Sequence, residues 1–561
     1  MIFCENSLSA HIKKMKKPDN QKTGMKVTFA ALGTEQLGIS MLSAIAKSKG
    51  HSVNLAFSAS LFHDRFNLEM PGISPFFDDT PEVIKAIEKQ QPDVLAFSPL
   101  TSTYQWALGI AKQAKELNPN IKTVFGGVHA SAVPHLLLKQ QAVDYVVVGE
   151  GDVAFPQIIN SVADKNFNQP IPNTKYKAKD GSIIHGLQTG FIQDLDALPF
   201  YDKPLWEEHV RLGDLYLTMA SRGCPYRCTF CFNNFFAKLP EEKSGKYVRL
   251  RSPAHMIAEL KIAQSRYKIE VIDFQDDVFT TSKKWLQDFL YLYKKEINKP
   301  FQILTHPRYM DDDIAKWLSS AGCTWVQMGV QSMDESFKKD TLMRYEKSED
   351  ISMALDVMNK YKMKVKVDHM FGLPDEPVNA QENARLLYAN HPPKRIQTFW
   401  TCFLPGTELM KDAMDKGIIT EIQAQKINEG EDFYFFRNTD NVKDVSLMNL
   451  YKAYEVIFRI MPVLPDFIKK KLKPEHIQKI PKILIRPMSM FSDIITGFMM
   501  QNPEFKAYAK HNTFHIKKFF LNKIGIHKIK ATSVINNVEF GMFVKELSPT
   551  LNTASAPSKV G

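Results

Sequence analysis

Short apolar runs alternate with helical segments twice along this chain, and that alternation limits the folds it can adopt. In the first third the apolar runs suit buried parallel strands, and the segments between them have helical spacing. The expected strands are 25–32, 52–57, 93–100, 122–128 and 143–151, with helices at 39–50, 81–91 and 104–118. Strands that alternate with helices form a parallel sheet covered on both faces. The sequence therefore predicts a doubly wound, Rossmann-like α/β domain over residues 25–165.

A second alternation follows a polar, turn-rich linker at 166–212, which is expected to be a loop or a small hairpin. The expected strands of this second part are 215–219, 270–280, 301–308, 323–334, 364–376 and 396–409. The expected helices are 255–268, 282–298, 311–322 and 348–363. About six β/α units are too few to close an eight-stranded barrel.

Three of the six cysteines lie close together, at the start of this second part, in the stretch "RGCPYRCTFCFNN". Their spacing is C-x3-C-x2-C, at Cys224, Cys228 and Cys231. A structural zinc site needs four ligands, and Cys323 and Cys402 are isolated in apolar strands. Three thiolates would leave one iron of a four-iron cluster open. Zinc binding and a chance pattern remain the alternatives.

This spacing, with Phe230 before the third cysteine, resembles the signature of the radical S-adenosylmethionine superfamily. The resemblance implies a partial (β/α)6 barrel of the TIM type over 213–420, with S-adenosylmethionine on the open iron. Four strand-end motifs match in order: "DFQDD", "GVQS", "GLPDE" and "LPGTEL". Taken singly, "DFQDD" could be a helix cap and "LPGT" a turn. The residues implied to bind S-adenosylmethionine are Phe230, Gln275, Asp276, Gln331, Ser332, Gly372, Pro374, Pro405 and Gly406.

Most members of the superfamily have G-x-E-S where this chain has "GVQS". Gln331 replaces that glutamate, which removes a charge but keeps a hydrogen-bonding group. We therefore expect Gln331 to be a weaker candidate for direct contact.

The first domain is similar to the cobalamin-binding domain that precedes many radical enzymes, on "FGGVHAS", "VVGEG" and the order of elements. Ligands of such sheets bind at the carboxyl ends of the strands. The residues expected to bind cobalamin there are Thr34, Glu35, Gly38, Ser98, Thr101, Gly126, Gly127, His129, Gly149 and Glu150. The alternative is that these glycines only make tight turns, since "GTEQLG" is not a dinucleotide fingerprint.

Domains that ligate cobalt from below carry D-x-H-x-x-G in the first loop, where this chain has Gly33 and Glu35. The resemblance therefore implies base-off cobalamin with no protein histidine on cobalt. His129 is the nearest rival, and its loop is expected to pack on the periphery of the cofactor.

Residues 25–420 together resemble the cobalamin-dependent radical S-adenosylmethionine enzymes, most of which are methylases. The resemblance implies methylation of an unactivated carbon through a 5′-deoxyadenosyl radical and methylcobalamin, with a one-electron reductant such as flavodoxin or ferredoxin. The alternative is a non-methylating oxidative cyclase or rearranging enzyme of the porphyrin-cyclase type. A third hypothesis, an iron–sulfur or cobalamin sensor that binds nucleic acid, has no supporting motif.

No catalytic or substrate-binding residue can be assigned from the sequence. His306, Arg308, Asp368 and His369 lie near expected strand ends, where they could face the barrel interior or serve as structural polar groups. The substrate is expected to be a small molecule or lipid-like.

The C-terminal region carries much of the net charge of +11. Residues 421–535 are expected to be mainly helical and basic, and the tails 1–24 and 536–561 to lie outside the folded domains, the latter disordered. The helices could cap the open barrel with a solvated basic face, or could lie on an anionic bilayer. The clustered cysteines, with no signal peptide and no membrane-spanning run, favour the cytoplasm, with peripheral contact at the inner face of the membrane as an addition.

Overall fold

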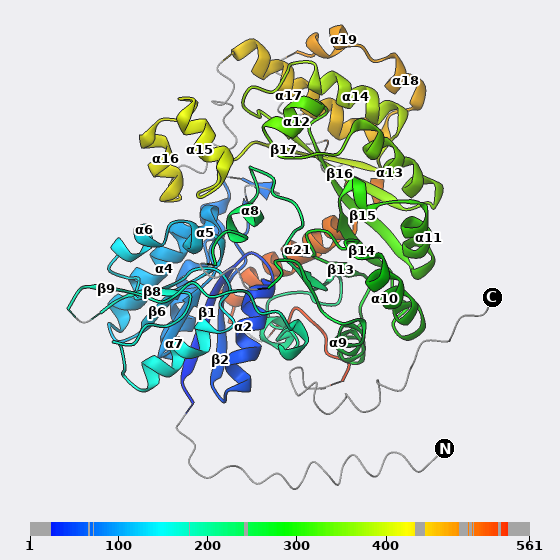
Figure 1. Ribbon diagram of the computed structural model, residues 1–561. Coiled ribbons are helices and arrows are strands. Elements are labelled where there is room, and N and C mark those ends of the chain that lie inside the picture. Colours follow the sequence, from blue (N-terminus) through cyan, green and yellow to red (C-terminus); the bar gives the residue numbers. More distant parts are fainter. Residues whose placement is uncertain are drawn as a thin grey trace, which may run out of the picture.

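Five parallel strands and an antiparallel hairpin form the first sheet of this computed structural model (Figure 1). The described residues run from 24 to 536, except for 65–67, 71, 179, 241–244, 432–443, 482–487, 489–491, 493–495, 498 and 526–528. The tails 1–23 and 537–561 therefore lie outside them. The spatial order is β2 (Ser52–Ser58), β1 (Lys26–Leu32), β5 (Val94–Phe97), β6 (Lys122–Phe125), β7 (Tyr145–Val147), β8 (Thr174–Lys177), β9 (Ile183–His185).

The parallel part has the order 2-1-3-4-5 of a doubly wound sheet, which confirms the predicted fold. The chain leaves β1 in one direction and β5 in the other, so the loops that follow these two strands flank the switch point, where such sheets bind ligands. The helices that cover the sheet are α2 (Leu37–Ser48), α3 (Thr80–Gln90), α4 (Tyr104–Leu117), α5 (Gly127–Ala132), α6 (Pro134–Lys139) and α7 (Ala154–Ala163).

Two hydrophobic cores lie on the two faces of this sheet, because successive side chains of a strand point to opposite sides. Phe29 of β1 packs on Phe155 of α7, with ring centroids 5.3 Å apart. The next residue, Ala30, belongs to the core on the other face, with Leu95. All four residues of β5 are buried, as a strand covered on both faces requires.

The expected linker contains the hairpin β8–β9, one of the two forms predicted for it. The hairpin pairs antiparallel with β7, and so it lengthens the first sheet. Its turn is formed at Asp180–Gly181, a dipeptide that favours hairpin turns, with Gly181 at φ +84°.

Six parallel strands form the second sheet in chain order, as an incomplete barrel requires. They are β10 (Tyr216–Thr218), β13 (Ile272–Phe274), β14 (Phe301–Thr305), β15 (Cys323–Gln331), β16 (Lys364–Phe371) and β17 (Arg395–Trp400). The helices around them are α9 (Pro253–Arg266), α10 (Lys283–Glu296), α11 (Asp312–Ala321), α12 (Glu335–Asp340), α13 (Ser348–Lys360) and α14 (Ala380–Asn390). Capping sets several of their ends: Ser252 accepts from the backbone of His255 at the start of α9, and Gly322 ends α11 at φ +106°.

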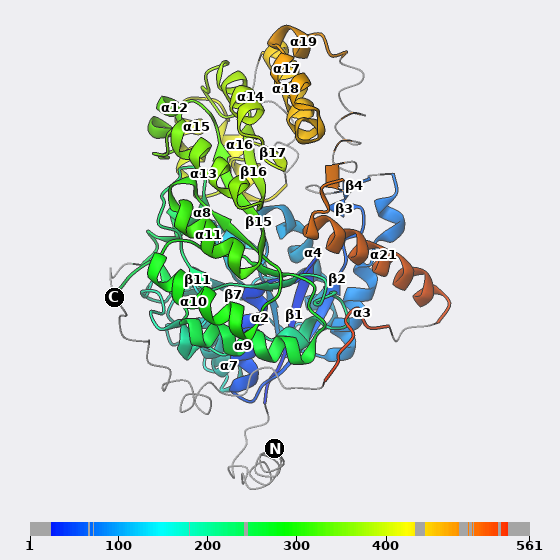
Figure 2. The same ribbon diagram turned by 90° about the vertical axis from the view of Figure 1, so that its right-hand side faces the viewer.

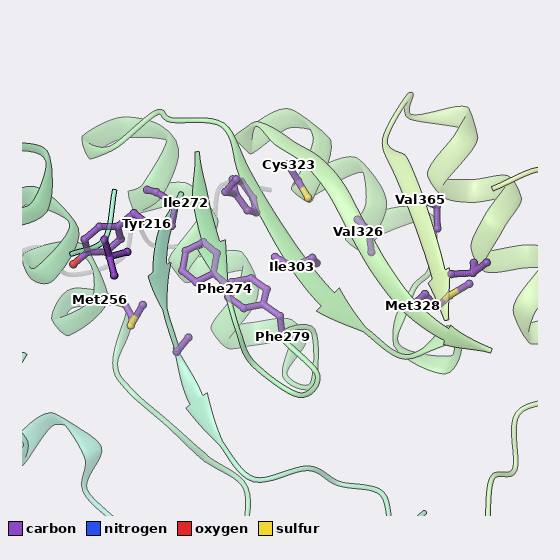
Figure 3. Close-up of a cluster of buried hydrophobic side chains, with 14 of the residues drawn as sticks. Tyr216, Met256, Ile272, Phe274, Phe279, Ile303, Cys323, Val326, Met328 and Val365 are labelled. Atoms are coloured by element: carbon purple, nitrogen blue, oxygen red, sulfur yellow. The ribbon is translucent and has the colours of Figure 1, made fainter. Parts of the chain in front are cut away.

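The core between this sheet and its helices is apolar and rich in aromatic rings (Figure 3). Phe274 lies at its centre, with the rings of Phe279 and Phe301 at 4.7 and 5.8 Å. Cys323 is buried in the same core, in β15, so its thiol serves as a small apolar side chain.

The described part of the C-terminal region is helical, as predicted. Its helices are α16 (Glu421–Asn428), α17 (Val445–Ile460), α18 (Asp466–Lys471), α19 (Pro474–Gln478) and α21 (Pro503–Lys523). Helix α15 (Glu408–Asp415) lies before them, at the end of the expected barrel, where the strand predicted over 396–409 ends at Trp400. None of the helices in the described ranges combines the length and apolar character needed to cross a bilayer.

Helix α21 contacts both sheets and connects the two halves of the molecule (Figures 1 and 2). At its start Glu504 pairs with Lys366 of β16 at 2.6 Å. In its middle Lys510 pairs with Asp214 at 2.9 Å, and near its end Phe519 packs on Phe77 of the first domain at 4.9 Å. Part of the C-terminal basic charge is therefore used within the fold.

A buried ion pair also joins the two α/β parts. The Nζ of Lys203 lies 2.7 Å from Oε1 of Glu35, and both side chains are at most 1% exposed. The same ammonium donates to the carbonyl of Leu217 in β10 and lies 4.4 Å from the ring centroid of Tyr216. Burial raises the pKa of Glu35, and the charge of Lys203 opposes that rise. The loop after β1 is thus tied to the first strand of the second sheet.

We predict that Lys203→Met lowers the free energy of unfolding by about 3–5 kcal/mol, because it leaves the Glu35 carboxylate buried without its partner. Urea denaturation would measure the loss. The double variant Glu35→Leu with Lys203→Met should recover most of it, since no uncompensated charge is then buried. Equal losses in the single and double variants would contradict the role given to the pair.

Candidate functional site

The cysteine loop follows directly from the first strand of the second sheet. After β10 the chain forms β11 (Ser221–Arg222), which pairs antiparallel with β12 (Arg249–Leu250). Residues 223–231 then lead into the short helix α8 (Phe232–Phe236). Gly223 starts the loop at φ +86°, and a Cβ there would lie 2.4 Å from the carbonyl oxygen of Tyr247. Only glycine fits this position.

The three thiols of the loop are free and largely withdrawn from solvent. Cys228 is buried, and Cys224 and Cys231 are half-buried. Burial is the main cause that raises the pKa of Cys224 to about 12 and that of Cys231 to about 11, and the neighbouring cysteines act in the same direction. A bound cation reverses this preference, because coordination deprotonates a thiol.

The donor set fits an iron–sulfur cluster better than a single zinc ion. Within the described ranges, no three His, Cys, Asp or Glu side chains are gathered closely enough to hold one metal ion. Thiolates spread around a loop instead suit a cluster, in which each thiolate binds its own iron.

Hydrogen bonds from the rest of the barrel fix the loop between its cysteines. The Thr229 hydroxyl donates to the carbonyl of Thr341 at 2.7 Å, and the Thr229 N–H donates to Leu342 at 3.2 Å. The backbone N–H of Leu409 donates to the Thr229 carbonyl at 3.0 Å. Phe230 packs against the apolar cluster that contains Leu342 and Leu409.

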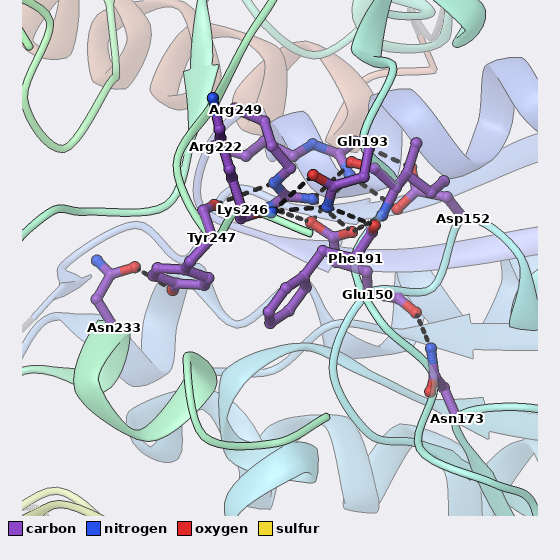
Figure 4. A network of polar contacts seen from close by, with 11 residues as sticks. Glu150, Asp152, Asn173, Phe191, Gln193, Arg222, Asn233, Lys246, Tyr247 and Arg249 are labelled. Carbon is purple, nitrogen blue, oxygen red and sulfur yellow. Dashed lines mark hydrogen bonds and ion pairs between the residues drawn. The ribbon is translucent and has the colours of Figure 1, made fainter. Parts of the chain in front are cut away.

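A polar group that the sequence reasoning missed lies beside Cys231. The amide of Asn233 donates to Asp277 at 2.8 Å, and its nitrogen lies 3.9 Å from the Cys231 sulfur. The hydroxyl of Tyr247 donates to the Asn233 side-chain oxygen at 2.6 Å (Figure 4). The only sequence signal for this group is that Asp277 stands in the "DFQDD" motif.

Asp276, another of the three carboxylates of that motif, is engaged by the chain that leads into the cysteine loop. Its carboxylate is buried and accepts from the backbone N–H of Ala220 at 3.0 Å and from the Ser221 hydroxyl. Burial raises its pKa to about 6. Asp276 thus holds the strand that enters the cysteine loop, and Asp277 is the carboxylate beside the cysteines. Gln275 is exposed and donates to Asp273 at 2.6 Å.

Gln331 has a strained backbone at the end of β15. Its φ is +66°, and the pairing of β15 with β16 shifts register between Gly329 and Gln331. A non-glycine residue in this region costs about 1–3 kcal/mol, and such strain concentrates at functional sites. This geometry turns the chain where the motif "GVQS" was expected to meet a ligand.

Ser332, the next residue, begins a chain of buried hydrogen bonds. Its hydroxyl donates to Glu376 Oε1 at 2.5 Å, and the Gln381 amide donates to Oε2 at 2.9 Å. His369 then bridges Gln381 at 2.8 Å and the hydroxyl of Tyr388 at 3.1 Å. Burial raises the pKa of Glu376 to about 8, so the carboxyl group is largely protonated at neutral pH. His369, for which an interior role was an alternative, is therefore a structural polar group.

The remaining residues expected to bind S-adenosylmethionine lie in tight turns. Gly372 and Gly406 have φ of +69° and +79°, and Pro374 and Pro405 are buried beside them. The Thr407 N–H donates to the Leu404 carbonyl at 3.2 Å, so "LPGT" is a turn that leads into α15. A Cβ on Gly406 would meet the ring of Phe235 at 3.0 Å, which brings this turn against α8.

Most residues expected to bind cobalamin gather where the first sheet ends. The Thr101 hydroxyl and His129 Nδ1 are 3.1 Å apart, and a Cβ on Gly127 would lie 2.7 Å from the Ser98 hydroxyl. His129 is buried with its Nε2 unpaired, and burial lowers its pKa to about 4. The imidazole is therefore neutral at physiological pH.

Thr34 and the other glycines lie at the same end of the first sheet. Thr34 is exposed in the loop after β1, and Gly38 is exposed in the first turn of α2, with open space around it. Gly126 is the N-cap residue of α5, and the N–H of Gly149 donates to the Ser131 hydroxyl at 2.9 Å.

Glu35 and Glu150, which were also expected to bind cobalamin, both form ion pairs between the two parts of the chain. Glu35 pairs with Lys203, as described above. Glu150 accepts two hydrogen bonds from Arg249 of β12, at 2.9 and 3.0 Å. Their carboxylates therefore hold the two parts together.

A second ion pair lies beside Glu150 (Figure 4). Arg222 of β11 donates two hydrogen bonds to Asp152, both at 2.9 Å. The loop after β7 is thus fastened to the β11–β12 ribbon that carries the cysteine loop. The end of the first sheet, where cobalamin was expected, and the cysteine loop therefore meet at these two ion pairs.

Comparison with known proteins gives two family models on this chain. A B12 binding domain matches residues 28–159, and the Radical SAM superfamily matches residues 219–387.

One curated relative is an uncharacterized methyltransferase of Pyrococcus horikoshii, 25% identical over 72% of this chain and 86% of its own. Another is the anaerobic magnesium-protoporphyrin IX monomethyl ester cyclase of Rubrivivax gelatinosus, 22% identical over 60% of this chain and 61% of its own. Among solved structures, the cobalamin-dependent S-adenosylmethionine radical enzyme OxsB matches with a TM-score of 0.59 and 14% identity, covering 90% of this chain and 76% of its own. At that identity the likeness shows the fold.

We predict that the stability of the protein depends on pH through Glu376. Its pKa is raised on folding, so the stabilisation is present below the unfolded value near 4.5 and is lost as the pH rises towards 8. Relative to Glu376→Gln, the wild-type free energy of unfolding should fall by up to about 5 kcal/mol over this range. Urea denaturation at pH 5, 6.5 and 8 would test this, and parallel curves for the two proteins would contradict it.

Proposed function

We propose that this chain, which belongs to the radical S-adenosylmethionine enzymes that carry a B12-binding domain, methylates an unactivated carbon. The observation that supports this best is the shared border of the two sites. The loop after β7, at the end of the B12-binding sheet, is bound by Asp152–Arg222 and Glu150–Arg249 to the ribbon that carries the cysteine loop. A reaction that uses both cofactors on one substrate needs such adjacency.

When bound, the iron–sulfur cluster and S-adenosylmethionine supply a 5′-deoxyadenosyl radical, and cobalamin supplies a methyl group that a carbon radical can accept. Cys224, Cys228 and Cys231 would hold three irons and leave the fourth to S-adenosylmethionine. Asp276 positions the entry to this loop, and Asn233 and Asp277 border Cys231. Gln331, Ser332 and the turns at Gly372 and Gly406 would form the other side of the S-adenosylmethionine site.

For cobalamin we propose the loops and first helical turns that follow the strands of the first sheet, at Thr34, Gly38, Ser98, Thr101 and Gly127. We also propose that it binds base-off without a protein histidine on cobalt. Glu35 stands where a lower histidine would be, and it is engaged by Lys203. His129 is only 1% exposed and lies in α5, outside the loop after β1, so its ring does not face an open site.

A non-methylating reaction of the porphyrin-cyclase type is the second candidate. The cyclase relative of Rubrivivax gelatinosus favours it, because that match extends over 60% of this chain. The two candidates differ in their products, so the experiment below separates them.

The substrate and the partners follow from the reaction class. Radical S-adenosylmethionine enzymes act on small-molecule substrates and need reductants. We propose flavodoxin or ferredoxin as the reductant, and a small or lipid-like substrate. For contact with an anionic membrane we propose α18, where Phe467 is 65% exposed and Lys470 and Lys471 are exposed beside it.

We predict that the anaerobically reconstituted protein, supplied with S-adenosylmethionine, cobalamin, reductant and an extract of its host, forms both 5′-deoxyadenosine and S-adenosylhomocysteine. Methylation consumes one S-adenosylmethionine for the radical and one for the methyl group. Chromatography with mass detection would measure both products. Formation of 5′-deoxyadenosine without S-adenosylhomocysteine would favour the cyclase-type reaction instead.

We predict that serine at any of Cys224, Cys228 or Cys231 removes most of the iron from a content of about four per chain. Cys402→Ser is the matched control, because Cys402 is a half-buried free cysteine outside the loop, and it should keep its iron. Iron analysis and the visible absorption of the cluster would be measured. Full iron in the three loop variants would overturn the site.

A further inference from the structure

We propose that Arg344 and Glu346 set the reduction potential of the iron–sulfur cluster, through opposite charges beside Cys228. This inference rests on the proposed cluster at the three cysteines. Arg344 is far from the cysteine motif in sequence and belongs to none of the four strand-end motifs, so no pattern in the chain points to it.

Arg344 is buried and held in one orientation by three contacts. Its Nη2 donates to the Gly329 carbonyl at 2.8 Å, and its Nε donates to Glu346 Oε1 at 2.7 Å. Its Nη1 is directed at the Cys228 sulfur, 4.0 Å away. The guanidinium is rigid and always charged, so fixing two of its edges also fixes the third. A positive charge is therefore held beside one of the three proposed ligands.

Glu346 is also buried, and it is ionised. Burial raises its pKa, but the close contact with His306 and the charge of Arg344 outweigh that effect and hold the pKa at about 2. His306 Nε2 lies 3.2 Å from Oε2, and Lys338 Nζ lies 3.7 Å from Oε1. Lys338 also donates to the backbone carbonyl of Glu346 at 3.0 Å.

The same group of residues contacts the cysteine loop at a second point, through His306. The ring of His306 stacks on Tyr226, with centroids 3.9 Å apart and planes 22° apart. Tyr226 stands two residues before Cys228, which Arg344 contacts. The loop is thus held at two points by one buried group of residues: Arg344, Glu346, His306 and Lys338.

The charges of Arg344 and Glu346 are buried, so little water lies around them to screen their effect on the cluster. One-electron reduction makes a cluster more negative, so a nearby positive charge stabilises the reduced form and raises the potential. Arg344 therefore raises the potential, and Glu346 lowers it. Because the two side chains are in contact and their charges are opposite, removing either charge separately should shift the potential in opposite directions.

The test is a reductive titration of the anaerobically reconstituted full chain, followed by electron paramagnetic resonance of the reduced cluster, without S-adenosylmethionine or substrate. Arg344→Gln should lower the midpoint potential and Glu346→Gln should raise it. Arg344→Lys, which keeps the charge, should stay near the wild type. Lys416→Gln is the control for a lost positive charge at the surface, since Lys416 is half-exposed and pairs with Asp375 at 2.8 Å, and it should leave the potential unchanged.

Iron content is measured first, because it separates a failure of the proposed cluster from a failure of the electrostatic role of Arg344 and Glu346. A wild-type protein without cluster iron would overturn the proposed cofactor. Shifts in the same direction for Arg344→Gln and Glu346→Gln, or no shift in variants with full iron, would overturn the electrostatic role while the cofactor stands. If Arg344→Gln does not assemble a cluster, Glu346→Gln decides by itself, because an unchanged or lower potential there contradicts the proposal.

Discussion

The ion pairs between the two α/β parts are the interactions on which the rest of the arrangement depends. Buried side chains of both sheets belong to one hydrophobic cluster, but apolar contact alone does not fix an orientation, and a reaction at their border requires the strand ends of one sheet to stay beside the cysteine loop of the other. Two arginines of the β11–β12 ribbon each make two hydrogen bonds to a carboxylate of the loop after β7. Such bidentate pairs fix orientation as well as distance. Lys203 and helix α21 add two further connections at other points of the border.

Buried carboxyl groups position the site more often than they face it. Asp276 holds the strand before the cysteines, Glu376 supports Ser332, and Glu346 orients Arg344. In each case at least one carboxyl oxygen accepts a hydrogen bond from the protein. A buried polar group is costly unless it is hydrogen-bonded, so these carboxyl groups are held by the protein and leave ligand contact to their neighbours. Asp277, next to Asp276 and exposed, illustrates the difference.

The sequence patterns predicted the order of the strands better than the surroundings of single side chains. Each of the four strand-end motifs lies at or after the end of a strand of the second sheet, but these strands end three to nine residues earlier than expected. The patterns did not show that Asp276, Glu35 and Glu150 are engaged within the protein, since a pattern does not say which of two adjacent side chains turns inward or which carboxylate meets a basic side chain. They also missed Asn233, Tyr247 and Arg344, whose partners are distant in sequence or carry no periodic signal.

The sequence by itself determined the two parallel sheets, their order along the chain, and the three cysteines. Each of these follows from local patterns, namely apolar runs, helical spacing, capping residues and a short ligand spacing. Only the tertiary structure decided which charges pair across the border, that α21 contacts both halves, and that Arg344 lies beside Cys228. These are contacts between residues far apart in the chain, set by how two independently patterned sheets pack, and no local pattern carries that information.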